Sequence, residues 1–392
     1  MPPQALGQDG AMESSMTDLR GIAEHFALPA AVTSVEPLGN GNVNDTFRVE
    51  TAGGQRFVLQ RLNTHVFPRP ELVMANIVAL NRHVAGRGAP SGPQRERWEL
   101  PEAIPLRAEA AESHGEPGGQ AFQLEVPSGV WRLISHVDQA TTHDTVLSLD
   151  HAAELGRGLG TFHRLIHDLP CAQLADTLEG FHITPAYLAS YERVRANLQS
   201  SSPERRFDAD ERHCIAFVEQ RRDLAGVLEQ AKAAGVLQLR PIHGDPKVNN
   251  VMLDATSGRA VALVDLDTVK PGLVHYDIGD CLRSGCNPAG EECRDLDAVV
   301  FDLDRCRAIL DGYLDQARGF LTPPDFDHLY VAGRLISFEL GLRFFTDHLA
   351  GNRYFKVSHP RHNLERALVQ FRLTESIEAQ EPAIRAVIEE LR

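Results

Sequence analysis

The stretch at residues 240–268, RPIHGDPKVNNVMLDATSGRAVALVDLDT, contains the pattern on which the interpretation of the whole chain depends. Two polar clusters flank a predicted β-hairpin in it, with strands expected at residues 251–253 and 260–264. The clustered residues are His243, Gly244, Asp245 and Asn250 before the hairpin, and Asp265 and Asp267 after it. Because a hairpin brings its two ends together, both clusters are expected at one place in the fold.

These side chains have the chemistry of a phosphoryl-transfer site. Asp245 can accept a hydrogen bond from a substrate hydroxyl and orient it for attack. Asn250, Asp265 and Asp267 offer the hard oxygen atoms that Mg²⁺ prefers, together with phosphate oxygens and water. Taken singly, each could be a turn or cap residue. Their joint order and spacing instead predict a kinase site, with Asp245 as the catalytic residue and the other three as metal ligands.

The first part of the chain is predicted to be rich in β-strands. Residues 1–18 are expected to form a flexible leader, followed by a short helix at 19–26. The predicted strands lie at residues 32–37, 44–50, 55–62, 104–108, 121–126 and 131–137, with a helix at 70–84. Residues 19–138 are therefore predicted to form one β-rich lobe.

Helical periodicity dominates the rest of the chain. The predicted helices span residues 150–168, 184–199, 208–234, 302–320, 324–348 and 362–392, with Pro382 expected to kink or split the last one. Residues 139–392 are thus predicted to form a mainly helical second lobe. A β-rich lobe followed by a helical lobe, with the 240–268 pattern early in the second half of the chain, predicts an α+β fold of the two-lobed protein-kinase-like type.

A glycine-rich segment joins the first two predicted strands. In a β-rich lobe its backbone N–H groups can face the phosphates of a nucleotide, and the alternative is an ordinary hairpin turn. Residue 60 lies on the third predicted strand, and residues 136–137 end the strand that precedes the second lobe. The residues expected to bind nucleotide are Gly39, Asn40, Gly41, Asn42, Asn44, Gln60, His136 and Val137.

Composition argues against several other functions. The chain has 392 residues, 43% of them hydrophobic, and a formal net charge of −15, which disfavours nucleic acid as the main partner. No apolar run approaches the roughly 20 residues needed to span a bilayer, and the N-terminus lacks the features of a secretory signal. The six cysteines form no Cys-x-x-Cys pair, so reduced thiols and a cytoplasmic location are expected.

The sequences HGDPKVNN at residues 243–250 and VDLDT at 264–268 resemble the aminoglycoside phosphotransferase and choline kinase superfamily. Within it, the chain is most similar to the bacterial N-acetylhexosamine 1-kinase family, from about residue 22 to residue 369. The segments that carry this likeness are GNG (39–41), FVLQ (57–60), NTHVFP (63–68), WR (131–132), DLDT (265–268), PG (271–272), GLRF (341–344) and HNL (362–364).

The resemblance implies an activity and a set of site residues. Members of that family use ATP and Mg²⁺ to phosphorylate the anomeric hydroxyl of an N-acetylhexosamine, so a small sugar is the implied substrate. Carried over to this chain, Asp245 is the catalytic aspartate and also contacts the substrate. Asn250 and Asp265 bind the metal, with Asp267 as a further ligand, and Arg343 and Tyr354 hold the sugar.

Two positions depart from related kinases. Gln60 stands where many kinase-like enzymes have a lysine that faces the phosphates, and the neighbouring Arg61 points to the opposite face of the strand. Gly244 stands where a well-known 1-kinase of the family has Asn. The first difference leaves the phosphate charge to the metal, the glycine-rich segment and Arg61. The second bears on the substrate more than on catalysis.

Other interpretations remain open at this stage. Arg343 could be an ion-pair partner of Glu339, four residues earlier on a predicted helix, and Tyr354 could be a packing residue. His243 is expected to brace the loop, and the resemblance implies that Asp277 and Asp280 support it. Arg283 could pair with one of these aspartates or touch the substrate. The acceptor could instead be an aminoglycoside, a choline-like amine or another small alcohol, or the chain could bind nucleotide without turnover. The sugar epimer, the nucleotide preference and the oligomeric state are also left open.

Overall fold

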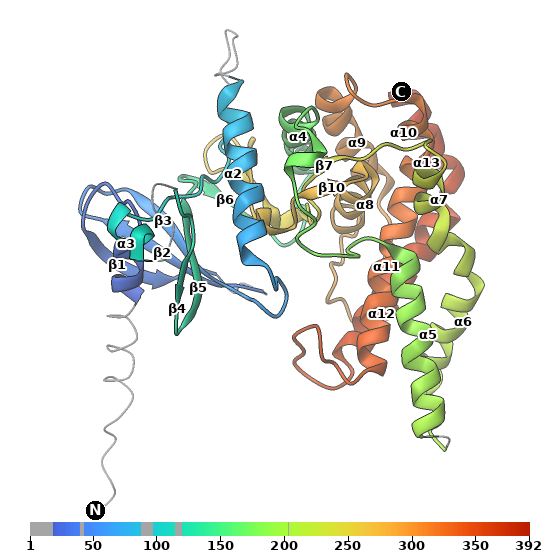
Figure 1. Ribbon diagram of the computed structural model, residues 1–392. Coiled ribbons are helices and arrows are strands. Elements are labelled where there is room, and N and C mark those ends of the chain that lie inside the picture. Colours follow the sequence, from blue (N-terminus) through green and yellow to red (C-terminus); the bar gives the residue numbers. More distant parts are fainter. Residues whose placement is uncertain (1–18, 40–42, 88–96, 114–119, 203) are drawn as a thin grey trace, which may run out of the picture. The chain divides into compact units, whose positions relative to one another are not determined.

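The chain divides into two compact units. The computed structural model describes residues 19–39, 43–87, 97–113, 120–202 and 204–392. One unit comprises Met1–Ala89 with Leu100–Asp138, and the other comprises Pro90–Glu99 with Gln139–Arg392. The first contains a β-sheet and the second is mainly helical (Figure 1). The predicted α+β fold, β-rich first and helical afterwards, is confirmed.

An antiparallel sheet of five strands forms the N-terminal unit, in the order β1-β2-β3-β5-β4. Its strands are β1 (Val32–Pro37), β2 (Asp45–Thr51), β3 (Arg56–Leu62), β4 (Leu124–Val126) and β5 (Gly129–Ser135). The helices of this unit are α2 (Pro70–Gly86), α3 (Ala108–Ser113) and the helical residues 19–24. Apolar side chains from alternate strand positions, including Val49, Leu59 and Leu133, form its core.

One predicted strand of this unit is wrong. Residues 104–108 make only isolated bridges nearby, between Ala103 and Ile134 and between Phe26 and Leu106. Pro105 has no backbone N–H to donate to a ladder, so a regular strand cannot run through it. The chain enters helix α3 at Ala108 instead.

Strand register fixes the surroundings of the third strand. Gln60 on β3 lies opposite Thr46 on β2 and Arg132 on β5, whereas Arg61 lies opposite Asp45 and Trp131. Successive side chains of a strand point to opposite faces. Gln60 and Arg61 therefore have different neighbours, as the sequence predicted.

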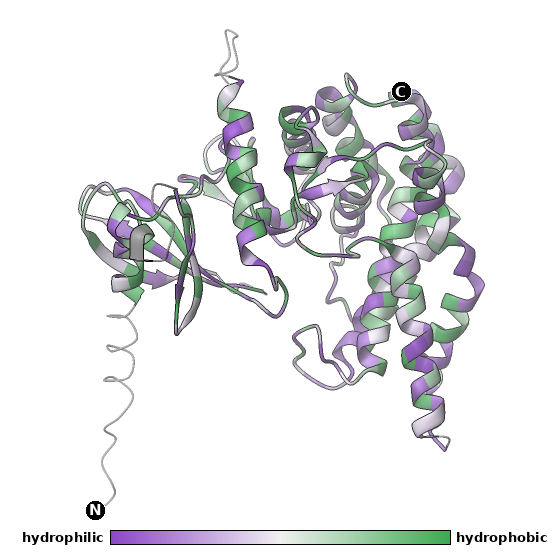
Figure 2. Ribbon diagram, viewed as in Figure 1, coloured by the Kyte–Doolittle hydropathy of each residue, from purple (hydrophilic) through white to green (hydrophobic). Residues whose placement is uncertain are grey.

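Eight helices of more than ten residues dominate the described part of the C-terminal unit (Figure 1). They are α4 (Leu149–Ile166), α5 (Thr184–Ser201), α6 (Ala209–Gln220), α8 (Val274–Gly285), α9 (Leu303–Ala317), α11 (Leu329–Leu349), α12 (His362–Ala379) and α13 (Glu381–Leu391). Hydrophilic and hydrophobic residues both occur along these helices, as expected when one side is buried (Figure 2). Glycine permits the close packing of α4 on α9, because a Cβ at Gly156 would lie 1.9 Å from the carbonyl oxygen of Ile309.

Two predicted helices are interrupted. The segment predicted as a helix at 208–234 is broken after α6 by η2 (Arg222–Gly226) before α7 (Val227–Ala233). At the break, Arg221 stacks on Phe217 and pairs with Glu378, so side-chain packing ends the helix there. The helix predicted at 324–348 is split into α10 (Pro323–Asp327) and α11. The expected split near Pro382 is confirmed, since Pro382 occupies the first turn of α13.

Two small sheets position the segment at 240–268. Strand β7 (Arg240–Ile242) pairs with β10 (Lys270–Gly272), and β8 (Val251–Asp254) pairs with β9 (Ala260–Leu263) and β6 (Ala140–Thr141). The predicted hairpin is confirmed as β8 and β9. It leaves the loop at 243–250 between β7 and β8, and the loop at 264–269 between β9 and β10. Within the described residues, no helix is long and apolar enough to cross a membrane.

Candidate active site

The loop that carries Asp245 is anchored by a buried carboxylate. Asp277, in the first turn of α8, accepts hydrogen bonds from the backbone N–H groups of His243 and Gly244, at 2.7 and 2.8 Å. His163 on α4 lies 2.9 Å from the same carboxylate. Burial would raise the pKa of Asp277, but His163, His243 and the backbone N–H groups lower it below its ordinary value. Asp277 is therefore an ionised support for the loop, as expected from the sequence.

Gly244 adopts a conformation that suits only glycine. Its φ is +91°, and a Cβ there would lie 2.6 Å from the carbonyl oxygen of Thr268. The Thr268 hydroxyl donates to the carbonyl of His243 at 2.8 Å. The loop at 243–250 and the loop at 264–269 thus touch at Gly244, and any side chain there would push them apart.

Asp245 has one occupied carboxylate oxygen and one open one. Its Oδ2 accepts from the Lys247 ammonium and from Asn250 Nδ2, the latter at 3.3 Å. No hydrogen bond to its Oδ1 occurs among the described residues, and its side chain is 27% exposed. Burial would raise the pKa of Asp245, but Lys247 outweighs it and holds the pKa below its ordinary value. Asp245 is thus an ionised acceptor with Oδ1 available to a hydroxyl.

His243 is a neutral brace for this loop. Its Nε2 lies 2.9 Å from the carbonyl oxygen of Val264 and must donate, while Nδ1 accepts from the backbone N–H of Asp245 at 3.2 Å. Burial lowers the pKa of His243, which agrees with an uncharged ring. Both ring nitrogens are used to tie the two loops together.

The predicted metal ligands lie on these same loops. Asn250 Nδ2 donates to the carbonyl oxygen of Asp245 at 2.7 Å, which leaves the amide oxygen to face another ligand. Asp265 has φ 65° and ψ 58°, a left-handed conformation that is uncommon for residues other than glycine and clusters at functional sites. Asp267 follows in η4 (Leu266–Thr268) and is 2% exposed. One amide and two carboxylates fit Mg²⁺, which takes its remaining ligands from phosphate and water.

A second group of residues surrounds Arg343 on α11. Its guanidinium carbon lies 5.0–5.9 Å from the centres of four aromatic rings. The rings, which we call the aromatic cage, belong to Phe181, Tyr187, Tyr354 and Phe355. Burial would lower the pKa of Arg343, but Tyr187, Tyr354, Glu339 and Asp245 raise it above its ordinary value. Arg343 is thus a permanent cation within electrostatic reach of Asp245.

Arg343 is not the ion-pair partner of Glu339. Glu339 is 1% exposed, and its two oxygens are occupied by His182 Nδ1 at 2.9 Å and the Thr184 hydroxyl at 2.6 Å. No hydrogen bond or ion pair to the Arg343 guanidinium occurs in the described part of the chain. The donors of Arg343 are therefore available to a ligand.

His182 links this group to the loop of Asp245. Its Nε2 lies 2.7 Å from the carbonyl oxygen of Gly244, and its Nδ1 faces Glu339. A carbonyl and a carboxylate both require a donor, so both ring nitrogens carry protons. Burial would lower the pKa of His182, but Glu339 and the Gly244 carbonyl raise it. His182 is thus a buried imidazolium between Arg343's helix and the loop of Asp245.

Asp347 holds the loop that bears Tyr354 and Phe355. Its carboxylate accepts hydrogen bonds from the backbone N–H groups of Arg353, Tyr354 and Phe355, at 2.8–3.0 Å. Asn363 on α12 donates to the same carboxylate at 2.9 Å. The aromatic cage therefore depends on one buried carboxylate near the end of α11.

In the N-terminal unit, two of the predicted nucleotide residues are engaged with other residues of that unit. Gln60 Oε1 accepts from Arg132 Nε and Nη2, at 2.9 and 2.7 Å, and Gln60 Nε2 donates to Thr46 at 3.1 Å. The Asn44 side chain accepts from the backbone N–H of Asn63 at 2.9 Å.

The remaining predicted nucleotide residues are placed as follows. His136 Nδ1 lies 2.7 Å from Asp138 Oδ1, and the adjacent Val137 is 5% exposed. Gly39 has φ +65°, while Asn40, Gly41 and Asn42 lie outside the described residues.

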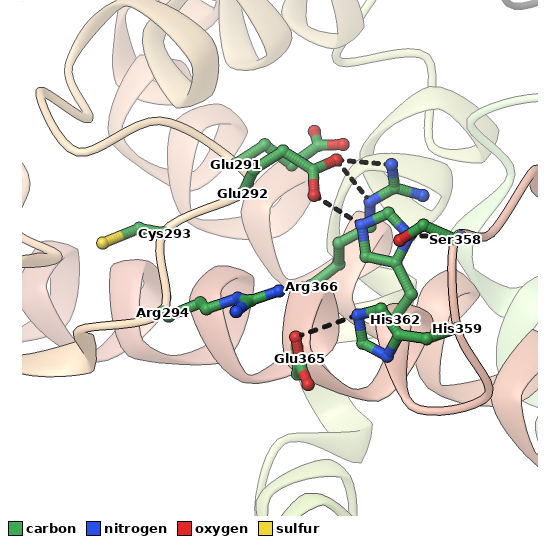
Figure 3. Close-up of a pocket in the computed structure, with 9 residues that line it drawn as sticks. All are labelled: Glu291, Glu292, Cys293, Arg294, Ser358, His359, His362, Glu365 and Arg366. Carbon is green, nitrogen blue, oxygen red and sulfur yellow. Dashed lines mark hydrogen bonds and ion pairs between the residues drawn. The ribbon is translucent and has the colours of Figure 1, made fainter.

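Two glutamates that follow α8 are paired with cationic side chains of the same unit. Glu291 lies 3.2 Å from Arg283, and Glu292 pairs with His362 and Arg366. These carboxylates line a polar cavity of about 210 Å³ (Figure 3). Arg283 also pairs with Asp280 at 2.7 Å, as one of the sequence interpretations expected. Glu291 and Glu292 are thus not a free acidic patch.

Sequence reasoning missed several of these residues. Lys247 lies inside the quoted stretch, two positions after Asp245, so its signal was present. His182, Tyr187 and Asp347 had no local signal, because their partners lie far away along the sequence.

One protein-family model matches most of the chain. It is described as the phosphotransferase enzyme family and covers residues 34–309. The match includes the glycine-rich segment and the loops from Asp245 to Asp277. It ends before Arg343 and Tyr354, so it bears on the transfer chemistry more than on the acceptor.

Solved structures share the fold at low sequence identity. An aminoglycoside phosphotransferase from Alicyclobacillus acidocaldarius subsp. acidocaldarius DSM 446 superimposes with TM-score 0.57 and 15% identity, over 99% of this chain and 98% of that chain. A choline kinase from Cryptosporidium parvum Iowa II has TM-score 0.54 and 12% identity, over 97% and 99%. A spectinomycin phosphotransferase, solved with ADP and spectinomycin, has TM-score 0.53 and 12% identity, over 97% and 99%. At these identities the likeness shows the fold alone.

Proposed function

Because the chain belongs to the phosphotransferase enzyme family, we propose that it transfers the terminal phosphoryl group of ATP to the anomeric hydroxyl of an N-acetylhexosamine. GlcNAc and GalNAc are the candidate acceptors, and the product is the sugar 1-phosphate. The C-terminal unit supplies the reacting groups and the acceptor site. The nucleotide is held by the N-terminal unit through Gly39, Asn40, Gly41, Asn42, Asn44, Gln60, His136 and Val137.

Asp245 orients the acceptor. Its open Oδ1 accepts the hydrogen bond of the sugar hydroxyl, while Oδ2 stays fixed by Lys247 and Asn250. The acceptor oxygen bonds to the γ-phosphorus as the bond to the β–γ bridging oxygen breaks, and that electron pair leaves with ADP. The hydroxyl proton passes to Asp245 and then to solvent. Because the pKa of Asp245 is lowered, the carboxylate is ready to accept at neutral pH.

Magnesium completes the charge balance. Asn250, Asp265 and Asp267 are the residues proposed to hold it, and when bound it neutralises the negative charge of the phosphates. The amide of Asn250 is already oriented for this task by its bond to the Asp245 carbonyl. Asp277 and His243 keep both loops in place, so the ligands need little rearrangement.

The observation that carries the substrate assignment is the free guanidinium of Arg343 inside the aromatic cage. A guanidinium presents several N–H donors, which suit the carbonyl of an acetamido group and the hydroxyls of a sugar. Ring faces beside it offer an apolar surface for the body of the ligand. A fixed cation at this place repels cationic acceptors, which disfavours choline-like amines and aminoglycosides.

The aminoglycoside alternative would need free carboxylates around the acceptor. Glu291 and Glu292, which line a cavity in the C-terminal unit, are paired with Arg283, His362 and Arg366. A polycationic substrate would have to replace these internal partners. The pairing therefore supports a neutral acceptor.

A substrate panel tests the proposal. ADP release with magnesium-ATP would be measured for GlcNAc, GalNAc, glucose, galactose, kanamycin and choline, and the product examined by phosphorus NMR. We expect turnover on an N-acetylhexosamine, a 1-phosphate product, and loss of turnover in Asp245→Asn. Arg343→Met should weaken binding of the sugar more than binding of ATP. Turnover confined to kanamycin or choline would refute the substrate assignment while leaving the phosphotransferase family intact.

A further inference from the structure

The peptide group between Gly244 and Asp245 is held at both of its polar ends. The carbonyl oxygen of Gly244 lies 2.7 Å from His182 Nε2, and the backbone N–H of Asp245 donates to His243 Nδ1 at 3.2 Å. Because a peptide group is planar and rigid, these two hydrogen bonds fix its orientation. The orientation of this plane in turn determines where the backbone places the Asp245 side chain. His182 and His243 therefore control the position of the carboxylate that we propose to orient the acceptor.

The segment at residues 176–184, which we call the strap, contacts each part of the candidate site in the C-terminal unit. The Thr177 hydroxyl donates to the carbonyl oxygen of Asp267 at 2.8 Å. Phe181 contributes one ring of the aromatic cage, and its carbonyl oxygen accepts from the buried Lys270 ammonium at 3.2 Å. The strap thus joins a loop of proposed metal ligands, the loop of Asp245 and the proposed acceptor site.

His182, in the strap, has an uncommon backbone conformation. Its φ is +63°, in the left-handed region that residues other than glycine seldom adopt. Its ring stacks on Tyr276 with 5.4 Å between ring centres and 22° between ring planes. Backbone strain of this kind persists only where the surrounding structure maintains it, and it clusters at functional sites. The imidazole therefore has a fixed position against the loop of Asp245.

The protonation state of His182 decides whether it can hold the Gly244 carbonyl. As an imidazolium, the ring donates from Nε2 to Gly244 and from Nδ1 to Glu339 Oε1, which lies at 2.9 Å. A neutral ring has one N–H, and the charged carboxylate of Glu339 attracts it more strongly than a carbonyl does. Nε2 would then present a lone pair to the Gly244 oxygen, and the two acceptors would repel each other. Deprotonation therefore releases the peptide group that carries Asp245.

The groups that face His182 favour its charged form. Glu339 lies on α11, while Tyr276 and Asp280 lie on α8. Burial would lower the pKa of His182, but Glu339, the loop carbonyl and Asp280 raise it above its ordinary value of 6.5. Burial and Glu229 raise the pKa of Tyr276, so that phenol stays neutral. The hydrogen bond to the loop is thus complete below the folded pKa of His182 and is lost as pH rises through it.

We infer that His182 is a positioning residue for phosphoryl transfer, whose imidazolium form holds the Gly244–Asp245 peptide group in the reactive orientation. This inference rests on the proposed kinase function. His182 touches neither the acceptor nor the nucleotide, and it keeps its protons during the reaction. The bonding changes remain those given above.

The test measures kcat from pH 6 to pH 10 for the wild-type protein, Glu339→Gln and His182→Gln. We expect the wild-type kcat to fall roughly 10- to 100-fold as pH rises through the folded pKa of His182. In Glu339→Gln, the amide oxygen accepts from Thr184 and the amide N–H group faces Nδ1, so a neutral His182 keeps its proton on Nε2 for Gly244. The alkaline fall should therefore disappear in that variant.

Two further variants complete the comparison. His182→Gln should lower kcat roughly 10- to 100-fold at every pH, with KM for ATP changed less than about threefold. His275→Gln is the matched control, because His275 is also fully buried and its Nε2 lies 3.0 Å from a backbone carbonyl, that of Asp325. Burial lowers the pKa of His275 to about 4, so its ring is neutral throughout the range. This control should keep the wild-type alkaline fall.

Several outcomes would overturn the inference. One is a wild-type kcat that stays constant from pH 6 to pH 10, and another is a Glu339→Gln protein that keeps the wild-type alkaline fall. Nitrogen NMR of the His182 ring in the wild-type protein supplies a readout that needs no activity and no variant. We expect two protonated ring nitrogens at pH 6 and one, Nδ1, at alkaline pH. A ring that is neutral across the range decides against the inference even if a variant fails to fold.

The choice of acceptor separates this inference from the substrate proposal. If no N-acetylhexosamine reacts, the pH profiles are measured with whichever panel acceptor does react, or with water as the acceptor in ATP hydrolysis. An alkaline fall that Glu339→Gln removes there upholds the inference although the sugar assignment fails. A wild-type protein that releases no ADP under any of these conditions overturns both.

Discussion

His182 and Glu339 form a buried ion pair, with His182 Nδ1 2.9 Å from Glu339 Oε1 and both side chains at most 4% exposed. They are 157 residues apart in the sequence. Because the other nitrogen of His182 holds the carbonyl of Gly244, the pair joins helix α11 to the loop of Asp245. Arg343, which we propose to hold the acceptor, lies one turn further along the same helix. The helix that bears Arg343 is therefore tied to the loop that bears Asp245.

This pair predicts a pH-dependent stability. Glu339→Gln should lower the free energy of unfolding by about 3–5 kcal/mol near pH 6, because it leaves His182 without its counter-charge. His182 has a raised pKa in the folded state, so its contribution is complete below its ordinary value of 6.5 and is lost as pH rises through the folded pKa. Glu339 has a lowered pKa, so its contribution holds above its ordinary value of 4.5 and is lost on further acidification.

Denaturant unfolding of wild type and Glu339→Gln between pH 5 and 9 measures the contribution of this ion pair. The difference between the two free energies of unfolding should shrink toward alkaline pH. Glu365→Gln is the control, since its pairing with His359 is exposed and worth at most about 1 kcal/mol. A difference between wild type and Glu339→Gln that stays constant across the range would contradict a charged His182.

Gly244→Ala should destabilise the protein and lower kcat. The substitution places a Cβ 2.6 Å from the Thr268 carbonyl in a left-handed backbone, at a cost of about 1–3 kcal/mol or more. Gly258→Ala is a matched control, because Gly258 has φ +69° but no atom within 4 Å of the position that a Cβ would take. Thermal unfolding and kcat of both variants check this, and equal losses would show that contact with Thr268 has no effect of its own.

Asp347→Ala should weaken binding of the acceptor and leave binding of the nucleotide unchanged. Removing the carboxylate releases three backbone N–H groups that hold Tyr354 and its neighbours beside Arg343. We expect KM for the acceptor to rise at least about tenfold, equivalent to about 1.4 kcal/mol, with KM for ATP nearly unchanged. Initial rates at varied acceptor and ATP separate the two constants. Asp304→Ala, an exposed carboxylate on α9, serves as control, and a parallel rise in both constants would count against the aromatic cage.

Gln60→Ala should destabilise the N-terminal unit. The change removes the acceptor for two N–H groups of the buried Arg132, a loss of about 1.5–3 kcal/mol. Arg61→Ala, on the opposite face of the same strand, breaks an exposed pair with Asp45 and should cost at most about 1 kcal/mol. Equilibrium unfolding compares the two, and equal effects would mean that the buried Gln60–Arg132 contact adds nothing to stability.

Local sequence pattern determined the fold class and the core of the candidate site. Alternation and helical periodicity predicted the strands β1–β3 and most of the helices, because those patterns depend on neighbours within one or two turns. The loop with Asp245 and Asn250 is likewise a local feature, since both lie within six residues of each other. Local pattern predicted the wrong secondary structure at residues 104–108 and missed the helix breaks beside Arg221 and His328, where tertiary packing determines the backbone conformation.

Only the tertiary structure decided how the site is supported. The spacing of four residues suggested Glu339 as an ion-pair partner for Arg343, whereas in the folded protein Glu339 pairs with His182. It likewise brings Tyr187 to Arg343 and Arg132 to Gln60. These contacts join residues whose separation along the chain carries no periodic signal, so no spacing rule could predict them. The order of amino acids determined which chemical groups are present, and long-range packing determined which of them are paired and which stay available to a substrate.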